Sequence, residues 1–483
     1  MPRVAFVNQS AHDDDNIAAN PARLLNLYPS PIADAENGRT VFALKSVLGQ
    51  DAKDSIGANP IRAMGRGNNL NWLVGNGRLY QVAANGTLTE RGTVADDANT
   101  TIAGNFGLVT IVSGGLYYVW NGTTISQPTT KTFADVGSHC FVGGYTVLTE
   151  RNGKRFQWSA IGNAASLNAL HFASADKVDD NILRAVEFRG NLLVMCETST
   201  EIWQIDPDAA AVSRFAYATI TNTGLKAFNL FVRFDDALFF IGNDNRAYMF
   251  GQGVVSNTAV ETALAQSNPT HCFYYEDEGH KFCVIRFSNR PAWVYDIATG
   301  LWHERSEGAG HIRWRAVASL RNGAGWLVGN TDGEVLELAR TNRDLSGALH
   351  RRAIARSLFL GDRKFSVPKV ELLARVGDHD LEAAETFVLD AGDGFAIFAG
   401  TDEALFAGST LAGPRDAMID LYESPDGGRT WRGPKPRSMG RHGDFDQRMI
   451  WRARGQFQQY TMRFDIAEPA DITLYSDGYV TAT

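Results

Sequence analysis

Cysteine is scarce in this chain, and its few cysteines are far apart. The 483 residues include four, Cys140, Cys196, Cys272 and Cys283, and no two of them form a Cys-x-x-Cys pair. Disulfide frameworks and structural zinc sites use cysteines at short, recurring spacings. We therefore expect four reduced, mostly buried thiols, and no metal or cofactor site built from them.

Long apolar runs are missing as well. No segment approaches the roughly 20 consecutive apolar residues that a membrane-spanning helix requires. The N-terminal segment Met-Pro-Arg-Val-Ala-Phe-Val also lacks the longer apolar core of a secretory signal. We expect a protein without a membrane-spanning segment, made in the cytoplasm and leaving the cell only as part of a larger particle.

The chain has no surplus of positive charge. Its 46 lysines and arginines face 54 aspartates and glutamates, which gives a formal net charge of -8 at pH 7. A protein that reads a nucleic-acid sequence normally has a basic face, because contacts to phosphate supply much of the affinity. The acidic balance argues against such a reader. It is compatible with a wall past which DNA slides, because a negative surface repels phosphate.

Common catalytic motifs are absent too. We find no Gly-x-Ser-x-Gly, no His-Glu-x-x-His, no phosphate-binding loop and no Rossmann glycine fingerprint. The histidines are dispersed, and we expect His271, His280 and His303, which lie beside predicted strands, to serve packing or hydrogen bonding. His12 precedes three aspartates in what we expect to be a solvated turn, not a metal site. We therefore predict no catalytic residues, no metal, no cofactor and no enzymatic activity.

The composition indicates a large β protein. Hydrophobic residues make up 44% of the chain and charged residues 21%, and it contains 47 glycines, 27 phenylalanines, 14 tyrosines and 10 tryptophans. These values are typical of globular proteins with many short strands joined by tight turns. The chain is too long for one ordinary core, so two or three domains are expected.

A repeating unit of strand, tight turn and strand begins near residue 68. Residues 70–74 and 79–82 form the first copy, and residues 108–112 and 116–120 form a very similar second copy. Weaker copies follow, and their central turns recur about every 35 to 50 residues, as in propeller blades. A single blade cannot bury both of its faces, so blades stacked around an axis are the economical solution. We predict a β-propeller of about seven blades.

The rest of the chain defines two further regions of an all-β protein. Residues 1–67 are predicted to form an irregular N-terminal arm that could lend a strand elsewhere, followed by the propeller over residues 68–345. Residues 346–483 contain longer strand candidates without the short repeat, and we predict a C-terminal β-sandwich-like domain there. An insertion rich in Ala, Gly and Asp interrupts it at about 377–415.

A hairpin motif stands near the C-terminus. The alternating pattern of residues 418–431 predicts a half-buried hairpin, and the spacing Ser-x-Asp-x-Gly-x-Thr-Trp resembles an Asp-box. This motif is a folding device that occurs in sialidases, other propellers and unrelated β proteins, and its Ser and Asp brace the turn. The residues with this structural role would be Ser424, Asp426, Gly428, Thr430 and Trp431.

Basic residues are concentrated around this hairpin. Two interpretations stay open, a solvated face and a docking surface for an acidic partner subunit. The candidate docking residues are Arg429, Arg432, Arg437, Arg441, Arg448 and Arg452.

Several segments together resemble one family of phage proteins. Residues 23–28 near the start, the repeat-built β region and the C-terminal hairpin occur in the order found in nozzle proteins of short-tailed (podovirus) bacteriophages. These proteins are also called tail hub or packaged-DNA stabilisation proteins. Further segments that carry the resemblance are 156–161, 172–176, 179–182, 191–196, 201–203, 446–451 and 459–464.

The resemblance implies a structural role in the virion. It implies a homo-hexameric ring at the distal end of the tail, below the portal and the adaptor ring, assembled in the host cytoplasm. Such a ring would continue the DNA channel without sequence recognition and retain the packaged genome. It would also dock a tail needle or plug and tailspikes or fibres.

Two other classes remain open on the sequence alone. A carbohydrate-binding or sialidase-like Asp-box propeller would bind or cleave glycans as a monomer. For sialidase chemistry it would need converging arginines, a Tyr paired with a Glu and preferably several Asp-boxes, of which one is visible. A generic propeller scaffold would serve cellular partners and would not be encoded beside virion genes.

Overall fold

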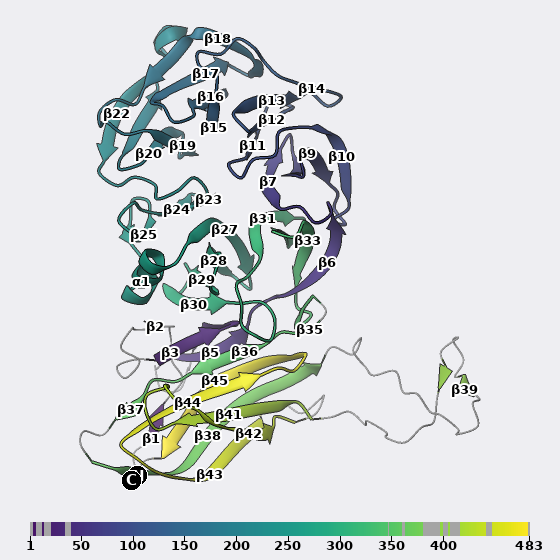
Figure 1. Cartoon of the computed structure of the whole chain (residues 1–483), viewed down its shortest axis with the longest axis vertical. Helices are drawn as coiled ribbons and strands as arrows, with labels where there is room; N and C mark the ends of the chain where they lie inside the picture. Colours follow the sequence, from purple (N-terminus) through teal and green to yellow (C-terminus); the bar gives the residue numbers. More distant parts are fainter. Residues whose placement is uncertain are drawn as a thin grey trace. The chain divides into compact units, whose positions relative to one another are not determined.

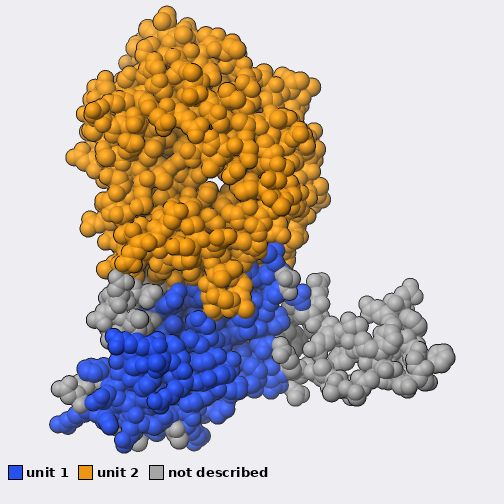
Figure 2. All heavy atoms as spheres, in the orientation of Figure 1, with its two compact units in different colours: residues 1–49, 340–483 blue, residues 50–339 orange. Residues whose placement is uncertain are grey.

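The computed structural model shows a chain built almost entirely of β-strands (Figure 1). It forms two compact units, unit 1 from residues 1–49 and 340–483 and unit 2 from residues 50–339 (Figure 2). No helix in the described part of the chain is long and apolar enough to cross a membrane. The structure describes residues 3–5, 12–13, 21–33, 40–345, 347–359, 363–379, 397–398, 404–405, 416–440 and 447–481.

Unit 2, which is described throughout, is a seven-bladed β-propeller. In blades 1 to 6, four consecutive strands pair antiparallel in chain order, and the first strand of every blade lies nearest the axis (Figure 1). Blades 1 and 2 consist of β7 (Ile61–Gly67), β8 (Leu70–Gly75), β9 (Arg78–Val82), β10 (Leu88–Thr93), β11 (Thr101–Asn105), β12 (Leu108–Ser113), β13 (Leu116–Trp120) and β14 (Ile125–Ser126). Blades 3 and 4 consist of β15 (Val136–Val142), β16 (Tyr145–Glu150), β17 (Arg155–Ala160), β18 (Asn163–Ser174), β19 (Ile182–Phe188), β20 (Asn191–Cys196), β21 (Thr200–Ile205) and β22 (Phe215–Thr221), with a 3₁₀ turn η1 (Ala211–Ser213).

The last three blades include a helix and a strand from far away in the chain. Blade 7 takes its fourth strand from β6 (Gly49–Ser55), which precedes blade 1 and pairs with β33. Blades 5 and 6 consist of β23 (Phe231–Phe234), β24 (Ala237–Ile241), β25 (Ala247–Met249), β26 (Gly253–Val254), β27 (Pro269–Asp277), β28 (His280–Phe287), β29 (Ala292–Asp296) and β30 (Leu301–Arg305), with α1 (Thr258–Gln266) between them. Blade 7 adds β31 (Ala316–Asn322), β32 (Gly325–Asn330) and β33 (Glu334–Ala339).

Tight turns join the first and second strands of every blade. In each, the first turn residue has a positive φ, and two of the seven are Gly143 and Gly323. Equivalent strands of a propeller run in the same direction along the axis, so these turns surround one end of it, which we call the turn face. Its residues are Asn68, Phe106, Gly143, Arg189, Asp235, Glu278 and Gly323.

The propeller core lies between neighbouring blades. Trp72 of blade 1 packs in one cluster with Val109 and Trp120 of blade 2, and Leu73 of blade 1 packs with Val317 and Val335 of blade 7. Apolar residues on both faces of a blade are thus buried by its neighbours. The second cluster closes the ring.

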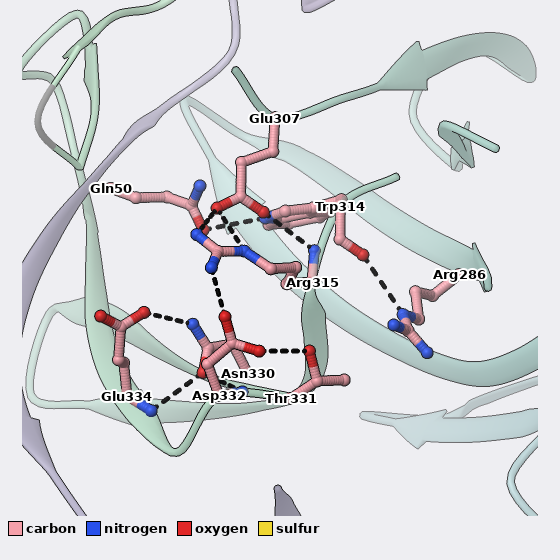
Figure 3. A network of polar contacts seen from close by, with 9 residues as sticks. All are labelled: Gln50, Arg286, Glu307, Trp314, Arg315, Asn330, Thr331, Asp332 and Glu334. Carbon is pink, nitrogen blue, oxygen red and sulfur yellow. Dashed lines mark hydrogen bonds and ion pairs between the residues drawn. The ribbon is translucent and has the colours of Figure 1, made fainter. Parts of the chain in front are cut away.

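A polar network reinforces this closure (Figure 3). The indole Nε1 of Trp314 donates a hydrogen bond of 2.8 Å to Gln50 Oε1 on β6. The guanidinium of Arg315 donates from Nε to Glu307 Oε1 at 2.9 Å and also forms an ion pair with Asp332 at the turn between β32 and β33. The buried Gln50 amide therefore fastens β6, the strand that completes blade 7, and Arg315 ties the segment before β31 to the turn between β32 and β33.

Unit 1 is a sandwich of two antiparallel sheets. Trp451 on β43 is fully buried, and its ring centroid lies 5.8 Å from that of Phe464 on β44 in the other sheet. One sheet has the order β4 (Leu27–Ala33), β5 (Thr40–Ser46), β45 (Ala470–Thr481), β38 (Phe365–His379), β43 (Gln447–Phe457), with β1 (Arg3–Ala5) paired to β45. The other has the order β3 (Pro21–Leu25), β36 (Arg351–Ile354), β44 (Gln459–Ile466), β41 (Met418–Ser424), β42 (Arg432–Ser438), with β2 (His12–Asp13) paired to β3 and β37 (Leu358–Phe359) to β44. Two short strand pairs lie outside these two sheets, β34 (Arg343–Asp344) with β35 (Gly347–Ala348) and β39 (Ile397–Phe398) with β40 (Ala404–Leu405).

The predicted fold class is confirmed, but the predicted boundaries differ from the observed units. Residues 1–67 do not form one arm, because β3, β4 and β5 belong to the sandwich and β6 and β7 to the propeller. The prolines of residues 21–31 indicate irregular structure from the sequence alone, but the structure places three of them in strands. Pro29 and Pro31 lie on β4, which ends its sheet, and Pro21 is the first residue of β3. A missing N–H is tolerated at these positions. Most of the predicted insertion at 377–415, and the aspartates that follow Asp13, lie outside the described residues.

Candidate docking surface

Four of the predicted docking arginines, Arg432, Arg437, Arg448 and Arg452, lie on two edge strands of the sandwich, and Arg429 lies in the turn before the first of them. Strand β42 ends one sheet and β43 ends the other. The two strands touch, because Trp451 Nε1 donates to the Lys435 carbonyl at 2.9 Å and Arg437 Nε donates to the Ile450 carbonyl at 3.2 Å. The structure thus brings Arg432 and Arg437 of β42 to the same edge of the sandwich as the arginines of β43. We call Arg429, Arg432, Arg437, Arg448 and Arg452 the basic edge.

All five side chains of the basic edge are exposed. Arg448 forms an ion pair with Glu371 on β38. Among the described residues, no carboxylate forms an ion pair with Arg429, Arg432, Arg437 or Arg452. Arg441, the sixth predicted docking residue, lies outside the described residues. The basic edge therefore presents uncompensated positive charge on a chain whose net charge is -8.

Strand β42 also resists pairing with another strand. Its sequence Arg-Gly-Pro-Lys-Pro-Arg-Ser contains two prolines, and six of its seven residues are exposed. Proline cannot donate to a neighbouring ladder, and charge on an edge opposes sheet-to-sheet aggregation. A partner would therefore meet this edge through side-chain charges.

The Asp-box residues brace the turn that leads into β42. The buried Ser424 hydroxyl donates to Asp426 Oδ1 at 2.7 Å and accepts the Gly428 N–H at 2.7 Å. Asp426 accepts the Thr430 N–H at 2.9 Å and the Thr430 hydroxyl at 2.6 Å. These bonds to the ionised carboxyl lower the pKa of Asp426 to about 2. The Trp431 ring lies 5.0 Å from the Arg463 guanidinium, which places it on the hairpin flank.

Sequence reasoning missed a buried carboxylate beneath the basic edge. Glu423 is 2% exposed, accepts the Tyr460 hydroxyl at 2.7 Å and forms ion pairs with Lys435 and, at 3.7 Å, with Arg454. Lys435 and Arg454 therefore neutralise Glu423 within the sandwich. The exposed arginines of the basic edge are the cations that could contact a partner. The sequence contains a signal for this site, because the alternating pattern places Ile419, Leu421 and Glu423 on the inward face of β41. A buried carboxylate on that face needs a cation.

The histidines and cysteines considered in the sequence lie in buried, structural environments. Burial lowers the pKa of His271 and of His303 to about 3, and His280 Nδ1 lies 2.7 Å from Asp296 Oδ2. Burial also raises the pKa of the Cys140 and Cys196 thiols to about 12. In the parts of the chain that the structure describes, no three His, Cys, Asp or Glu residues gather closely enough to hold a metal ion.

The fold defines a β-propeller protein with a second, β-sandwich unit. The family described as "Bacteriophage P22 Gp10, beta-propeller" matches residues 53–342, and the chain belongs to this family. The predicted relationship to phage nozzle and stabilisation proteins is thereby confirmed. The chain is a phage structural protein and a virion component.

Other comparisons are more distant. No curated protein sequence matches the chain. Among solved structures, the computationally designed Ika8 protein is 13% identical with a TM-score of 0.40, covering 60% of this chain and 100% of that one. The Neurospora crassa Pan2 WD40 domain is 10% identical with a TM-score of 0.39, covering 60% and 94%. Chaetomium thermophilum Raptor is 8% identical with a TM-score of 0.39, covering 62% and 30%.

Proposed function

We propose that this chain forms a homo-hexameric ring at the distal end of a short phage tail, where it continues the DNA channel and retains the packaged genome. The ring binds the tail adaptor ring on one side, a needle or plug at its exit, and tailspikes or fibres outside. It assembles in the host cytoplasm and passes DNA without reading its sequence. Membership of the P22 Gp10 family supports the tail location, and the acidic net charge of -8 supports a path that does not hold DNA.

The observation that carries the proposal is the basic edge. A ring requires heterologous contacts, in which one face of each subunit meets a different face of its neighbour. Four exposed arginines of the basic edge have no carboxylate partner among the described residues, and they are complementary to an acidic surface. In the proposed ring, the basic edge meets an acidic face of the next subunit.

The test is the mass of the assembly in solution. Light scattering of the purified chain, alone and with the neighbouring tail proteins of the same phage, should give a closed ring near six subunits. The double variant Arg432→Glu/Arg437→Glu should weaken this association at least tenfold in low salt, because reversed charges repel the acidic face.

The matched control is Arg78→Glu on the propeller, where an exposed arginine pairs with Glu90. This variant should assemble like the parent chain. If the basic-edge variant assembles with unchanged affinity and salt dependence, the arginines do not mediate the contact. A chain that stays monomeric with every tail protein contradicts the ring itself, and glycan binding would then be measured.

A further inference from the structure

The propeller axis contains a cavity that opens toward the turn face. Its volume is about 890 Å³, and its lining includes the turn residues Asn68, Phe106 and Gly143. A second cavity of about 270 Å³ lies along the same axis, and Arg184 and Phe231 line both. These two side chains, together with Arg233, therefore lie where the two cavities adjoin.

Arg184 is a cation without a carboxylate partner among the described residues. Its guanidinium lies 4.5 Å from the Phe228 ring and 4.2 Å from the Phe231 ring. Its Nη1 donates to the Phe228 carbonyl at 3.1 Å and to Asn229 Oδ1 at 3.4 Å. Burial lowers the pKa of Arg184 to about 9, because these neutral neighbours do not compensate for lost hydration. A carboxylate entering the cavity would supply that compensation.

The lining of the larger cavity has a net positive charge. It includes Arg66, Arg184 and Arg233 but a single carboxylate, Glu187, which pairs with Arg233 at 2.5 Å. His139 also lines it, and burial lowers the pKa of this histidine to about 3, so it is neutral at pH 7. A pocket with two uncompensated positive charges on a chain of net charge -8 selects an anion.

A buried acceptor in the same lining points to a peptide and not to a bare anion. Asn105 is 1% exposed and uses its amide group to donate to Thr146 Oγ1 at 2.9 Å, while its Oδ1 has no hydrogen-bond partner. A buried carbonyl oxygen without a donor is costly. A peptide brings N–H donors as well as carboxylates, whereas an inorganic anion such as phosphate brings mainly acceptors.

Two exposed apolar side chains lie close together at the cavity mouth, one of which, Phe106, lines the cavity. Phe106 is 73% exposed, and Ile161, in the turn between β17 and β18, is 67% exposed. Both side chains lie within 4 Å of the position where Gly144 would carry a Cβ, and the Phe106 ring packs edge-on against Phe141 at 5.9 Å. Phe106 also has a φ of 41° at a turn position that favours Gly or Asn. Strain at a fixed, exposed aromatic residue is typical of a binding surface.

We propose that this cavity binds a peptide segment of a partner protein in which an acidic residue stands next to a large apolar residue. The carboxylate pairs with Arg184 and Arg66, and the apolar side chain packs on Phe106 and Ile161. The site is formed within a single unit 2, so the proposal does not depend on ring assembly.

The experiment measures binding of the full chain to a library of short peptides with free or amidated ends. Each peptide contains Asp or Glu next to Leu, Ile, Phe or Trp, in either order, and has an Asn or Gln counterpart. Fluorescence polarisation with the best binder should show at least tenfold weaker binding of the amide counterpart. Phe106→Ser should weaken binding of the acidic peptide at least fivefold. In Arg184→Gln or Arg66→Gln, the acidic peptide should bind no more tightly than its Asn or Gln counterpart.

Arg78→Gln on β9 is the control and should bind like the parent chain. Arg66 and Phe106 are exposed, so their variants keep the test valid if Arg184→Gln fails to fold. The proposal is overturned if no peptide is enriched, or if acidic and amide peptides bind equally. It is also overturned if Phe106→Ser has no effect while inorganic phosphate displaces the peptide, because the cavity would then be a site for small anions.

Discussion

At the scale of the residue, buried polar side chains determine the local geometry of the sandwich. Ser424 and Glu423 are adjacent, buried residues of β41. Ser424 accepts a hydrogen bond from the Gly428 N–H, and Glu423 accepts one from the Tyr460 hydroxyl. The motif around Ser424 is visible in the sequence because all of its partners lie within six residues. The partners of Glu423 are not visible, because Tyr460 meets it only after β41 and β44 have paired.

Ser424→Ala should destabilise the sandwich. The variant leaves the Gly428 N–H without its acceptor beneath the turn, and a lost buried hydrogen bond costs about 1–3 kcal/mol. Urea denaturation should show the free energy of unfolding reduced by that amount. Ser438→Ala, at an exposed position of β42, should change it by less than about 0.5 kcal/mol. Equal effects of the two variants would contradict the role of the Ser424 hydroxyl.

At the scale of the element, local turns are predictable and distant strand partners are not. The first blade is predictable because its strands are short apolar segments and because Asn and Gly residues mark its turns. Strand β6, Gly-Gln-Asp-Ala-Lys-Asp-Ser, has no apolar alternation, and its partner β33 lies nearly 300 residues away. Its position in blade 7 depends on backbone pairing and on polar contacts such as that of Lys53 with Glu337 at 2.6 Å.

Gln50→Leu should weaken the closure of the propeller. Gln50 is fully buried, and the substitution leaves the Trp314 N–H without its acceptor. We expect the free energy of unfolding of unit 2 to fall by about 1–3 kcal/mol, with earlier hydrogen exchange in β6 and β33. Gln81→Leu on β9, where the glutamine bonds the exposed Arg91, is the control. If β6 exchanges no faster in Gln50→Leu than in Gln81→Leu, the amide does not fasten the strand.

At the scale of the whole molecule, the propeller buries three histidines in neutral form. Burial lowers the pKa of His139, His271 and His303 to about 3, against an ordinary value near 6.5 in the unfolded chain. Between these values the unfolded state binds protons that the folded state excludes. Their contribution to stability is therefore complete above about pH 6.5 and is lost progressively as the pH falls toward 3.

Acid should destabilise the propeller before most carboxylates titrate. Each histidine contributes a slope of up to about 1.4 kcal/mol per pH unit, so the three together give up to about 4 kcal/mol per unit below pH 6. Calorimetry at constant ionic strength should show a transition temperature at pH 5 well below that at pH 8. His271→Gln should reduce the dependence of the unfolding free energy on pH. A transition temperature unchanged between pH 8 and pH 5 would contradict the neutral burial of these rings.

The chain order of the two units has a consequence for synthesis on the ribosome. The sandwich begins with residues 1–49 and is completed by residues 340–483, with the whole propeller encoded between them. At a synthesis rate of roughly 5–20 residues per second, β3 waits about 15–65 s for its partner β36, and β5 waits about 20–85 s for its partner β45. The propeller is the first unit that can finish folding, and the nascent sandwich strands must stay unaggregated until translation ends.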